Sequence, residues 1–151
     1  MEETTEILIR KMRPEDAEAA AALEAACFAQ PWKEETFRDY AAHPDICYMT
    51  AWDKGRLVGN CGVRNIVGEG EITNVAVAVD YRGQGLARRL MEALLAQGTA
   101  MGITDFTLEV RDGNEPAIRL YESLGFVQEG LRRNFYENPK EDARIYWKRD
   151  R

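Results

Sequence analysis

Residues 72–100 limit the folds open to this chain more than any other stretch. An apolar run at residues 72–79 leads into a turn that contains Gly83 and Gly85, and a helical pattern follows at residues 84–100. Apolar residues recur along this pattern at the spacing of one helix face: Leu86, Leu90, Met91, Leu94 and Leu95. The run at 72–79 shows little alternation, so we expect a strand in the sheet centre that is covered on both faces. A strand, a glycine turn and an amphipathic helix in this order predict an α/β fold.

The remaining segments add strands and helices around this unit, without an internal repeat or a linker. The expected strands are at 7–11, 45–52, 56–66, 104–109, 127–136 and 143–148, and the expected helices are at 14–27, 33–42 and 114–124. Glycine-containing turns should join strands at 53–55 and 68–70. This order predicts an α+β variant of the α/β class, with a mixed sheet that carries helices on its faces. The length predicts a single domain over residues 1–151.

Composition and charge narrow the class of protein. The chain is 45% hydrophobic and 30% charged, which is typical of a soluble globular protein. It has no uncharged apolar run near roughly 18 residues, and its acidic start at residues 1–6 is unlike a secretory signal. We therefore expect no membrane span and a cytoplasmic location. The net charge is -6, and residues 1–75 hold 14 acids against 8 bases, which disfavours nucleic acid as a partner.

The cysteines and the single histidine indicate no metal or disulfide framework. Cys27, Cys47 and Cys61 are scattered, and none belongs to a Cys-x-x-Cys pair. His43 stands beside Pro44 in a predicted loop, where no Ser/His/Asp or Cys/His system can be built on it. We expect these side chains to be structural or on the surface, with no metal bound.

The turn at residues 82–88 has the features of a phosphate cradle. The first N–H groups of a helix have no intrahelical partner, and the helix N-terminus carries a partial positive charge. Gly83 and Gly85 would let the backbone approach a pyrophosphate without a Cβ in the way. The Lys-Ser/Thr pair of a P-loop is missing, and Arg88 stands at the third glycine position of the dinucleotide fingerprint. A nicotinamide site is thus a weak alternative, and a purely conformational role for the glycines is another.

A second signal lies one strand and one helix further along the chain. A predicted strand ends at Glu109, and the next predicted helix carries Tyr121. A carboxylate can accept a proton and a phenol can donate one. On the residues alone, Glu109 could instead form an ion pair with Arg111, and Tyr121 could pack with Leu120 and Leu124 on its helix face.

Several blocks together resemble the GNAT N-acetyltransferase superfamily, whose members bind acetyl-coenzyme A. Arg82-x-x-Gly85-x-Ala87 is similar to the Arg/Gln-x-x-Gly-x-Gly/Ala signature of that superfamily. Further blocks resemble its RimI-type branch, which acetylates the N-terminal alanine of a small-subunit ribosomal protein: residues 28, 31–32, 72–77, 108–111, 114, 120–126, 132–136 and 141–143. The resemblance covers nearly the whole chain. It implies the GNAT fold, a mixed, mostly antiparallel sheet of about seven strands with four helices on its faces.

The resemblance also implies which residues hold the cofactor. The backbone of residues 75–77 would line the acetyl and pantetheine arm, beside a bulge that splays this strand from the next. Amides from 83–88 would hold the pyrophosphate, and Asn114 would lie near the thioester. The implied cofactor-binding residues are Val75, Ala76, Val77, Gly83, Gln84, Gly85, Leu86, Ala87, Arg88 and Asn114.

The same resemblance implies the catalytic and acceptor-binding residues. Glu109 would be the base for an α-amine, whose reference pKa of about 7.7–8.0 demands only a modest one. Tyr121 would donate to the departing thiolate or stabilise it by hydrogen bonding, with a reference pKa of about 10 that is a little above the value of about 8.5 for a thiol. Trp32 would close over the acceptor entrance, or else plug the core, and Tyr136 would contact the first residues of the acceptor.

Other functions remain open at this point. The acceptor could be a lysine side chain, a polyamine or another small amine, although the lysine pKa of about 10.4 demands a stronger base arrangement. The protein could also be a non-catalytic sensor that binds coenzyme A, but the presence of both Glu109 and Tyr121 argues against this. The first hypothesis is acetylation of the N-terminal α-amine of a ribosomal protein that starts with alanine.

Overall fold

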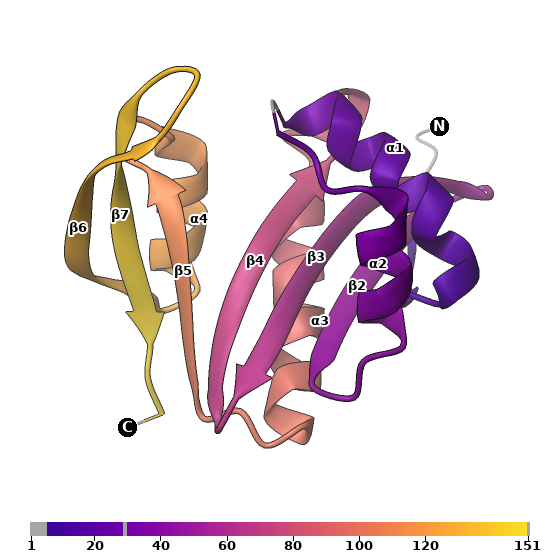
Figure 1. Ribbon diagram of the computed structural model, residues 1–151, viewed down its shortest axis with the longest axis horizontal. Helices are drawn as coiled ribbons and strands as arrows, with labels where there is room; N and C mark the ends of the chain where they lie inside the picture. Colours follow the sequence, from indigo (N-terminus) through magenta and orange to yellow (C-terminus); the bar gives the residue numbers. More distant parts are fainter. Residues whose placement is uncertain (1–5, 29, 151) are drawn as a thin grey trace.

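The computed structural model describes residues 6–28 and 30–150, which form a seven-stranded sheet with helices on its two faces (Figure 1). The strands are β1 (Leu8–Lys11), β2 (Ile46–Asp53), β3 (Arg56–Ile66), β4 (Glu69–Val77), β5 (Asp105–Arg111), β6 (Val127–Tyr136) and β7 (Glu141–Lys148). Their order across the sheet is β1-β2-β3-β4-β5-β7-β6, and only the β4–β5 pair is parallel. The predicted mixed, mostly antiparallel sheet is confirmed. The acidic residues 1–5 lie outside the described part of the chain.

Four α-helices cover the sheet, as predicted. They are α1 (Ala17–Cys27), α2 (Glu34–Ala41), α3 (Leu86–Ala100) and α4 (Glu115–Ser123), and the short 3-10 helices η1 (Pro14–Asp16) and η2 (Val79–Tyr81) precede α1 and follow β4. In Figure 1, α1 and α2 lie in front of the β2–β4 half, α3 lies behind it, and α4 lies behind β5. The predicted apolar stripe of α3 is buried, apart from the half-buried Leu95. No helix within residues 6–28 and 30–150 is long and apolar enough to cross a membrane.

β4 stands in the middle of the sheet, but the prediction that both its faces are covered is wrong. Within the predicted range, buried Ile72 and Ala76 alternate with exposed Thr73 and half-buried Val75 and Val77. Near its C-terminal end the strand borders a groove, so its apolar side chains there are partly exposed. The weak alternation in the sequence therefore reflects apolar residues that face a groove rather than a second covered face.

The turn that precedes β4 holds Val67 in an unfavourable backbone conformation. The chain reverses at Val67 (φ 50°) and Gly68 (φ 87°), so β4 begins at Glu69 and the predicted turn at 68–70 was placed too late. A left-handed conformation costs an L-residue about 1–2 kcal/mol, and a β-branched side chain fits it poorly. The side chain of Val67 is 99% exposed, so packing does not offset this cost.

We expect Val67→Asn to stabilise the protein by about 1 kcal/mol, because asparagine tolerates the left-handed region. The Tm in scanning calorimetry should rise by about 2–4 °C. Val79→Asn is the matched control, because Val79 is also exposed but has no positive φ. If the Tm rises equally in both variants, the gain in stability comes from surface polarity and not from relief of backbone strain.

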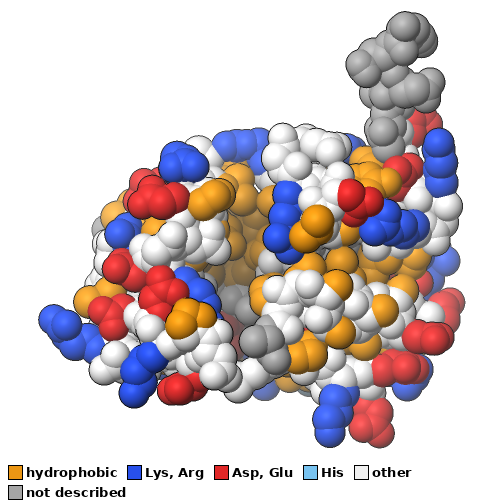
Figure 2. All heavy atoms as spheres, turned by 90° about the horizontal axis from the view of Figure 1, so that it is seen from above, with side chains coloured by type: hydrophobic (Ala, Val, Ile, Leu, Met, Phe, Trp, Pro, Cys, Tyr) orange, Lys and Arg blue, Asp and Glu red, His pale blue; other side chains and the backbone are white. Residues whose placement is uncertain are grey.

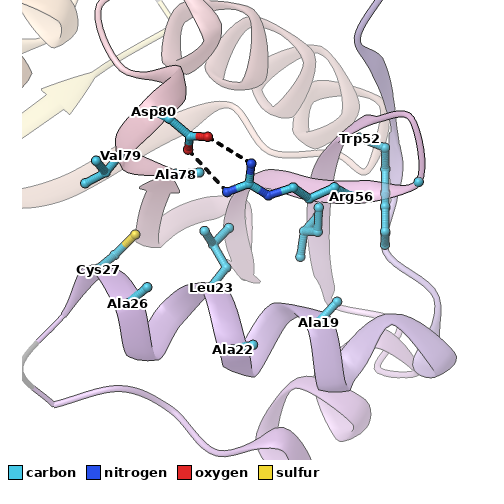
Figure 3. A pocket seen from close by; sticks show the side chains of 12 residues that line it. Ala19, Ala22, Leu23, Ala26, Cys27, Trp52, Arg56, Ala78, Val79 and Asp80 are labelled. Carbon is cyan, nitrogen blue, oxygen red and sulfur yellow. Dashed lines mark hydrogen bonds and ion pairs between the residues drawn. The ribbon is translucent and has the colours of Figure 1, made fainter.

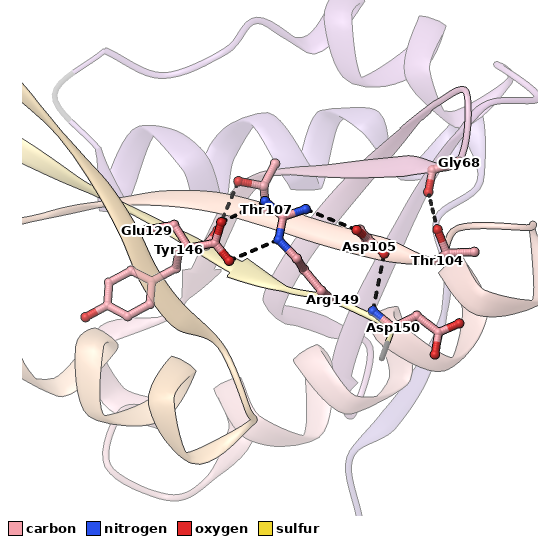
Figure 4. A network of polar contacts seen from close by, with 8 residues as sticks. All are labelled: Gly68, Thr104, Asp105, Thr107, Glu129, Tyr146, Arg149 and Asp150. Atoms are coloured by element: carbon pink, nitrogen blue, oxygen red, sulfur yellow. Dashed lines mark hydrogen bonds and ion pairs between the residues drawn. The ribbon is translucent and has the colours of Figure 1, made fainter.

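The C-terminal half of the sheet is tied together by Arg149 (Figure 4). Its Nη2 and Nε donate to Glu129 at 2.7 and 3.0 Å, its Nη1 donates to Asp105 Oδ2 at 3.1 Å, and it stacks over Trp147 at 4.1 Å. The backbone N–H of Asp150 also donates to Asp105, and it is the main cause of the lowered pKa of that carboxyl. These contacts join β5 to the β6–β7 hairpin, so this half keeps its own geometry where β5 parts from β4.

Candidate active site

β4 and β5 part toward the end of the sheet where the glycine turn lies. They pair only over Glu69–Glu71 and Asp105–Thr107, and then diverge (Figure 1). The register of β4 against β3 shifts between Cys61 and Val63, which marks a bulge just after the last pair with β5. Because the parted strands share no ladder there, the backbone groups on this edge of β4 have no partner on β5, although the carbonyl of Val77 accepts from Arg82 Nε at 2.9 Å. The splayed strand implied by the family resemblance is thus present.

A groove of about 560 Å³ occupies this opening, and we call it the β4–β5 groove. Viewed from above, the molecule is hollowed between its two halves, with hydrophobic side chains in the depth of the hollow (Figure 2). The predicted cofactor-binding residues that line the groove are Val75, Ala76, Val77, Gly83, Gly85, Leu86, Ala87, Arg88 and Asn114. Tyr121 lines it as well, so one cavity joins the glycine turn to one of the two predicted catalytic residues.

The glycine turn has a backbone that only glycine adopts readily. Gly83 and Gly85 have φ of 77° and 80°, and Gly85 is the N-cap of α3 without a side-chain cap. A Cβ at either position would meet nothing within 4 Å, so the glycines are required by conformation and leave open space in front of them. The first N–H groups of α3 lack intrahelical acceptors and face this space, which fits a diphosphate.

Two polar side chains of the turn, those of Gln84 and Arg82, form hydrogen bonds to nearby backbone carbonyls. Gln84 directs its Nε2 to the carbonyl of Asp80 at 3.2 Å and does not line the groove, which leaves only its backbone to contact a ligand. Arg82, to which we assigned no role, lines the groove: its Nε donates to the carbonyl of Val77 at 2.9 Å and its Nη2 lies 3.6 Å from Cys27 Sγ. The family signature contains Arg82, so the motif itself was the signal for this residue.

Helix α4 places Asn114 and Tyr121 on one wall of the groove. Asn114 is the N-cap of α4, and its Oδ1 accepts from the N–H of Ala117 at 3.3 Å. Tyr121 is buried, with its ring 6.0 Å from that of Phe126. Burial raises the pKa of the Tyr121 hydroxyl, so it is a neutral proton donor throughout the physiological range.

Glu109 lies on β5 beside the groove lining, within a group of charged and aromatic side chains. The Nε of Arg132 stands 3.0 Å from Glu109 Oε2. The alternative that Arg111 forms this ion pair is wrong, because Arg111 pairs with Glu141 at 3.2 Å and stacks over Tyr136 at 4.4 Å. Burial, with Glu109 as the next cause, raises the pKa of Tyr136 to about 12. Glu109 and Tyr136 are therefore neighbours.

The predicted proton acceptor and proton donor share a neighbour in Tyr136. The pKa of Tyr136 responds to Glu109, and the pKa of Tyr121 is raised chiefly by burial and in smaller part by Cys61 and Tyr136. Tyr136 is thus within electrostatic reach of Glu109 and of Tyr121. The roles predicted for Glu109, Tyr121 and Tyr136 stay predictions.

Trp32 lies apart from them, in an aromatic cluster. Its ring stands 5.8 Å from Phe37, 5.3 Å from Tyr40 and 6.4 Å from Tyr48. The hydroxyl of Tyr48 shares a hydrogen bond of 2.9 Å with Thr73 on β4. Trp32 does not line the β4–β5 groove, and its packing corresponds to the core-plug alternative. A role for it in acceptor binding stays a prediction.

A second groove, of about 610 Å³, lies between α1, the β2–β3 turn and the segment at 78–80 that follows β4 (Figure 3). Small side chains of α1 such as Ala19, Ala22 and Ala26 form one wall. Across from them, Arg56 and Asp80 form a two-fold hydrogen-bonded ion pair at 2.9 and 3.2 Å. Arg56 and Asp80 satisfy each other's hydrogen bonds, so this second groove offers no evident chemistry. Its volume is similar to that of the β4–β5 groove.

The remaining candidates have structural positions. Within residues 6–28 and 30–150, no group of three or more His, Cys, Asp or Glu side chains could hold a metal ion. Cys27 is a half-buried free thiol, and Cys47 and Cys61 are buried free thiols. The Nδ1 of His43 accepts from the backbone N–H of Asp45 at 3.0 Å, which fixes the loop after α2.

Comparison with known proteins finds relatives along nearly the whole chain. Residues 17–126 match the acetyltransferase (GNAT) family. An Escherichia coli protein named ribosomal protein bS18-alanine N-acetyltransferase is 35% identical over 139 residues, or 91% of this chain and 93% of that protein. A Mycobacterium tuberculosis protein named N-alpha-acetyltransferase RimI is 36% identical over 149 residues, or 93% of this chain and 91% of that protein.

The fold matches a solved structure of similar length. The crystal structure of the ribosomal-protein-S18-alanine N-acetyltransferase from Escherichia coli superposes with a TM-score of 0.87 at 33% sequence identity. The match covers 96% of this chain and 94% of that chain. The splayed strands, the glycine turn and both flanking helices therefore lie within the shared architecture.

Proposed function

Because this chain belongs to the acetyltransferase (GNAT) family, we propose that it acetylates the N-terminal α-amine of a ribosomal protein that begins with alanine. It is an N-acetyltransferase that uses acetyl-coenzyme A as co-substrate. One observation carries the proposal: the β4–β5 groove joins the glycine turn to Tyr121, and Glu109 stands nearby on the other strand. The names of the relatives support the acceptor, and that acceptor implies a cytoplasmic location.

The chain would hold the co-substrate mainly through its backbone. The amides of residues 83–88 at the start of α3 would bind the diphosphate, because they lack intrahelical partners and face open space. The freed edge of β4 at Val75–Val77 would bind the amide groups of the pantetheine arm. Bound there, acetyl-coenzyme A supplies an acetyl group activated as a thioester.

Three groups of the chain would then assist transfer. Glu109 accepts the proton that the acceptor amine loses as its nitrogen forms the amide bond, directly or through one water. The N–H of Val77 polarises the acetyl carbonyl oxygen. Tyr121 donates a hydrogen bond or its proton to the sulfur as the carbon–sulfur bond breaks, because its buried hydroxyl is in the protonated form. The transfer is direct and requires no acylated side chain.

Mass spectrometry of acetylated peptides tests this function. The enzyme and acetyl-coenzyme A are incubated with a peptide that starts with alanine, with its N-blocked counterpart that carries a lysine, and with a polyamine. We expect acetylation of the free N-terminus alone. Transfer only to the lysine or the polyamine would assign the other acceptor class, and cofactor binding without any transfer would indicate a sensor.

A further inference from the structure

We propose that Arg132 is a positioning residue for Glu109: its guanidinium, projected from β6, holds the carboxylate in the orientation that accepts the proton of the acceptor amine. The inference rests on the proposed function, since it assumes that Glu109 is the base. Arg132 itself need not touch the acceptor or the co-substrate.

The geometry of the sheet explains how Arg132 reaches Glu109. β7 lies between β5 and β6 (Figure 1), so the ion pair of 3.0 Å spans the whole width of one strand. In register, Glu109 is opposite Ile145 and Arg132 is opposite Ala143. Ala143 is buried and small, which leaves room for the long arginine side chain to cross β7 above it.

The neighbouring charges leave Arg132 as the counter-ion of Glu109 among the described residues. Arg111 is occupied by Glu141 and by the carbonyl groups of Glu137 and Pro139. Tyr136, the other titratable group facing Glu109, has a pKa of about 12 and is neutral at neutral pH. No other cation forms an ion pair with Glu109 in residues 6–28 and 30–150.

The Arg132–Glu109 ion pair orients the carboxylate rather than stabilising the fold. The side chain of Arg132 is 58% exposed and that of Glu109 is 30% exposed, and ion pairs so open to water add little to folding free energy. Arg132 is nevertheless held in place, because its guanidinium also packs over the ring of Phe135 at 5.4 Å. A carboxylate clamped between two strands keeps one rotamer, and small misplacements of a catalytic group are costly to rate.

Steady-state kinetics with three variants test the proposal on the full-length enzyme. We expect Arg132→Met to lower kcat by about tenfold, while the KM for acetyl-coenzyme A and the Tm stay near the wild-type values. Arg132→Lys should recover kcat to within about threefold of the wild type, because it keeps a cation on β6. Arg133→Met is the matched control, since Arg133 is exposed and has no ion pair in the described chain. It should leave kcat unchanged.

A double-mutant cycle shows whether Arg132 acts through Glu109. In the Glu109→Gln background, adding Arg132→Met should slow the enzyme no further, because there is no longer a carboxylate to position. An equal tenfold loss in that background, a wild-type kcat for Arg132→Met, or an effect confined to the KM of the peptide would each overturn the proposal.

The failure of the proposed function would look different from the failure of this inference. If the wild-type enzyme acetylates a lysine or a polyamine and no N-terminus, the proposed acceptor is wrong, yet the same variants can be compared with that amine. If the wild type acetylates no amine at all, both proposals are wrong. Transfer to the N-terminal peptide with a normal Arg132→Met variant removes the role of Arg132 alone.

Discussion

Replacing Glu109 with glutamine should lower kcat by about 10²–10³-fold, while the Kd for acetyl-coenzyme A stays within about twofold. The amide has nearly the shape of the carboxylate but cannot accept a proton from the acceptor amine. It also keeps an oxygen to which Arg132 can donate, so the β5–β6 contact need not collapse. Glu109 does not line the β4–β5 groove, which is why co-substrate binding should be spared.

The measurement is the initial rate with an alanine-initiated peptide, together with calorimetric titration of acetyl-coenzyme A. Glu71→Gln is the matched control: Glu71 is an exposed carboxylate on β4, and it pairs with Thr107, so it lies on the same face of the sheet as Glu109. It should keep the wild-type rate. A Glu109→Gln rate within threefold of the wild type would mean that water or another group takes the proton.

Local patterns were sufficient to predict most elements of the fold. Alternation and turn residues placed the β2–β3 and β6–β7 hairpins, and the helical stripe placed α3 with its buried leucines. The turn before β4 was misplaced because its first residue, Val67, has a positive φ that valine strongly disfavours. The sequence favours the nearby Gly-Glu-Gly triplet, and only the tertiary structure makes the chain reverse one residue earlier.

The groove and its lining were predicted, but the partners of the charged side chains were not. Residues two apart on a strand lie on one face, so Arg111 was a reasonable partner for Glu109. The partner actually chosen depends on the register of β6 against β7, which shifts at two places, between Gln128 and Gly130 and between Arg132 and Tyr136. Sequence patterns do not determine such irregular registers, so the pairing of Glu109 with Arg132 required the structure.

The aromatic residues illustrate the same limit. A tryptophan after a proline could cover an entrance or fill a core, and nothing in its local sequence separates these roles. The structure packs Trp32 against Phe37, Tyr40 and Tyr48, because α2 presents its aromatic face to β2 at this point. Tyr136, by contrast, lies within electrostatic reach of Glu109, and its predicted contact with the acceptor stays a prediction.

The second large effect should come from Tyr121→Phe, which we expect to lower kcat by about 10²-fold with little change in the KM for acetyl-coenzyme A. The substitution removes one buried oxygen and keeps the ring that packs near Phe126. Without the hydroxyl, the thiolate must leave unprotonated into a poorly hydrated groove, where a charge is unfavourable. The loss should therefore appear in the chemical step and not in binding.

The pH dependence separates a donor from a mere packing residue. Burial raises the pKa of Tyr121, so in the wild type the hydroxyl stays protonated as the pH rises to about 10 and kcat should show no loss from its titration in that range. Tyr146→Phe is the control, because Tyr146 is a buried tyrosine of the same half whose hydroxyl bonds to Glu122 away from the groove. Tyr146→Phe should lower the free energy of unfolding but leave kcat unchanged. If Tyr121→Phe retains the wild-type kcat with each peptide, the thiolate must receive its proton from solvent. Tyr121 on α4 would then only line the groove.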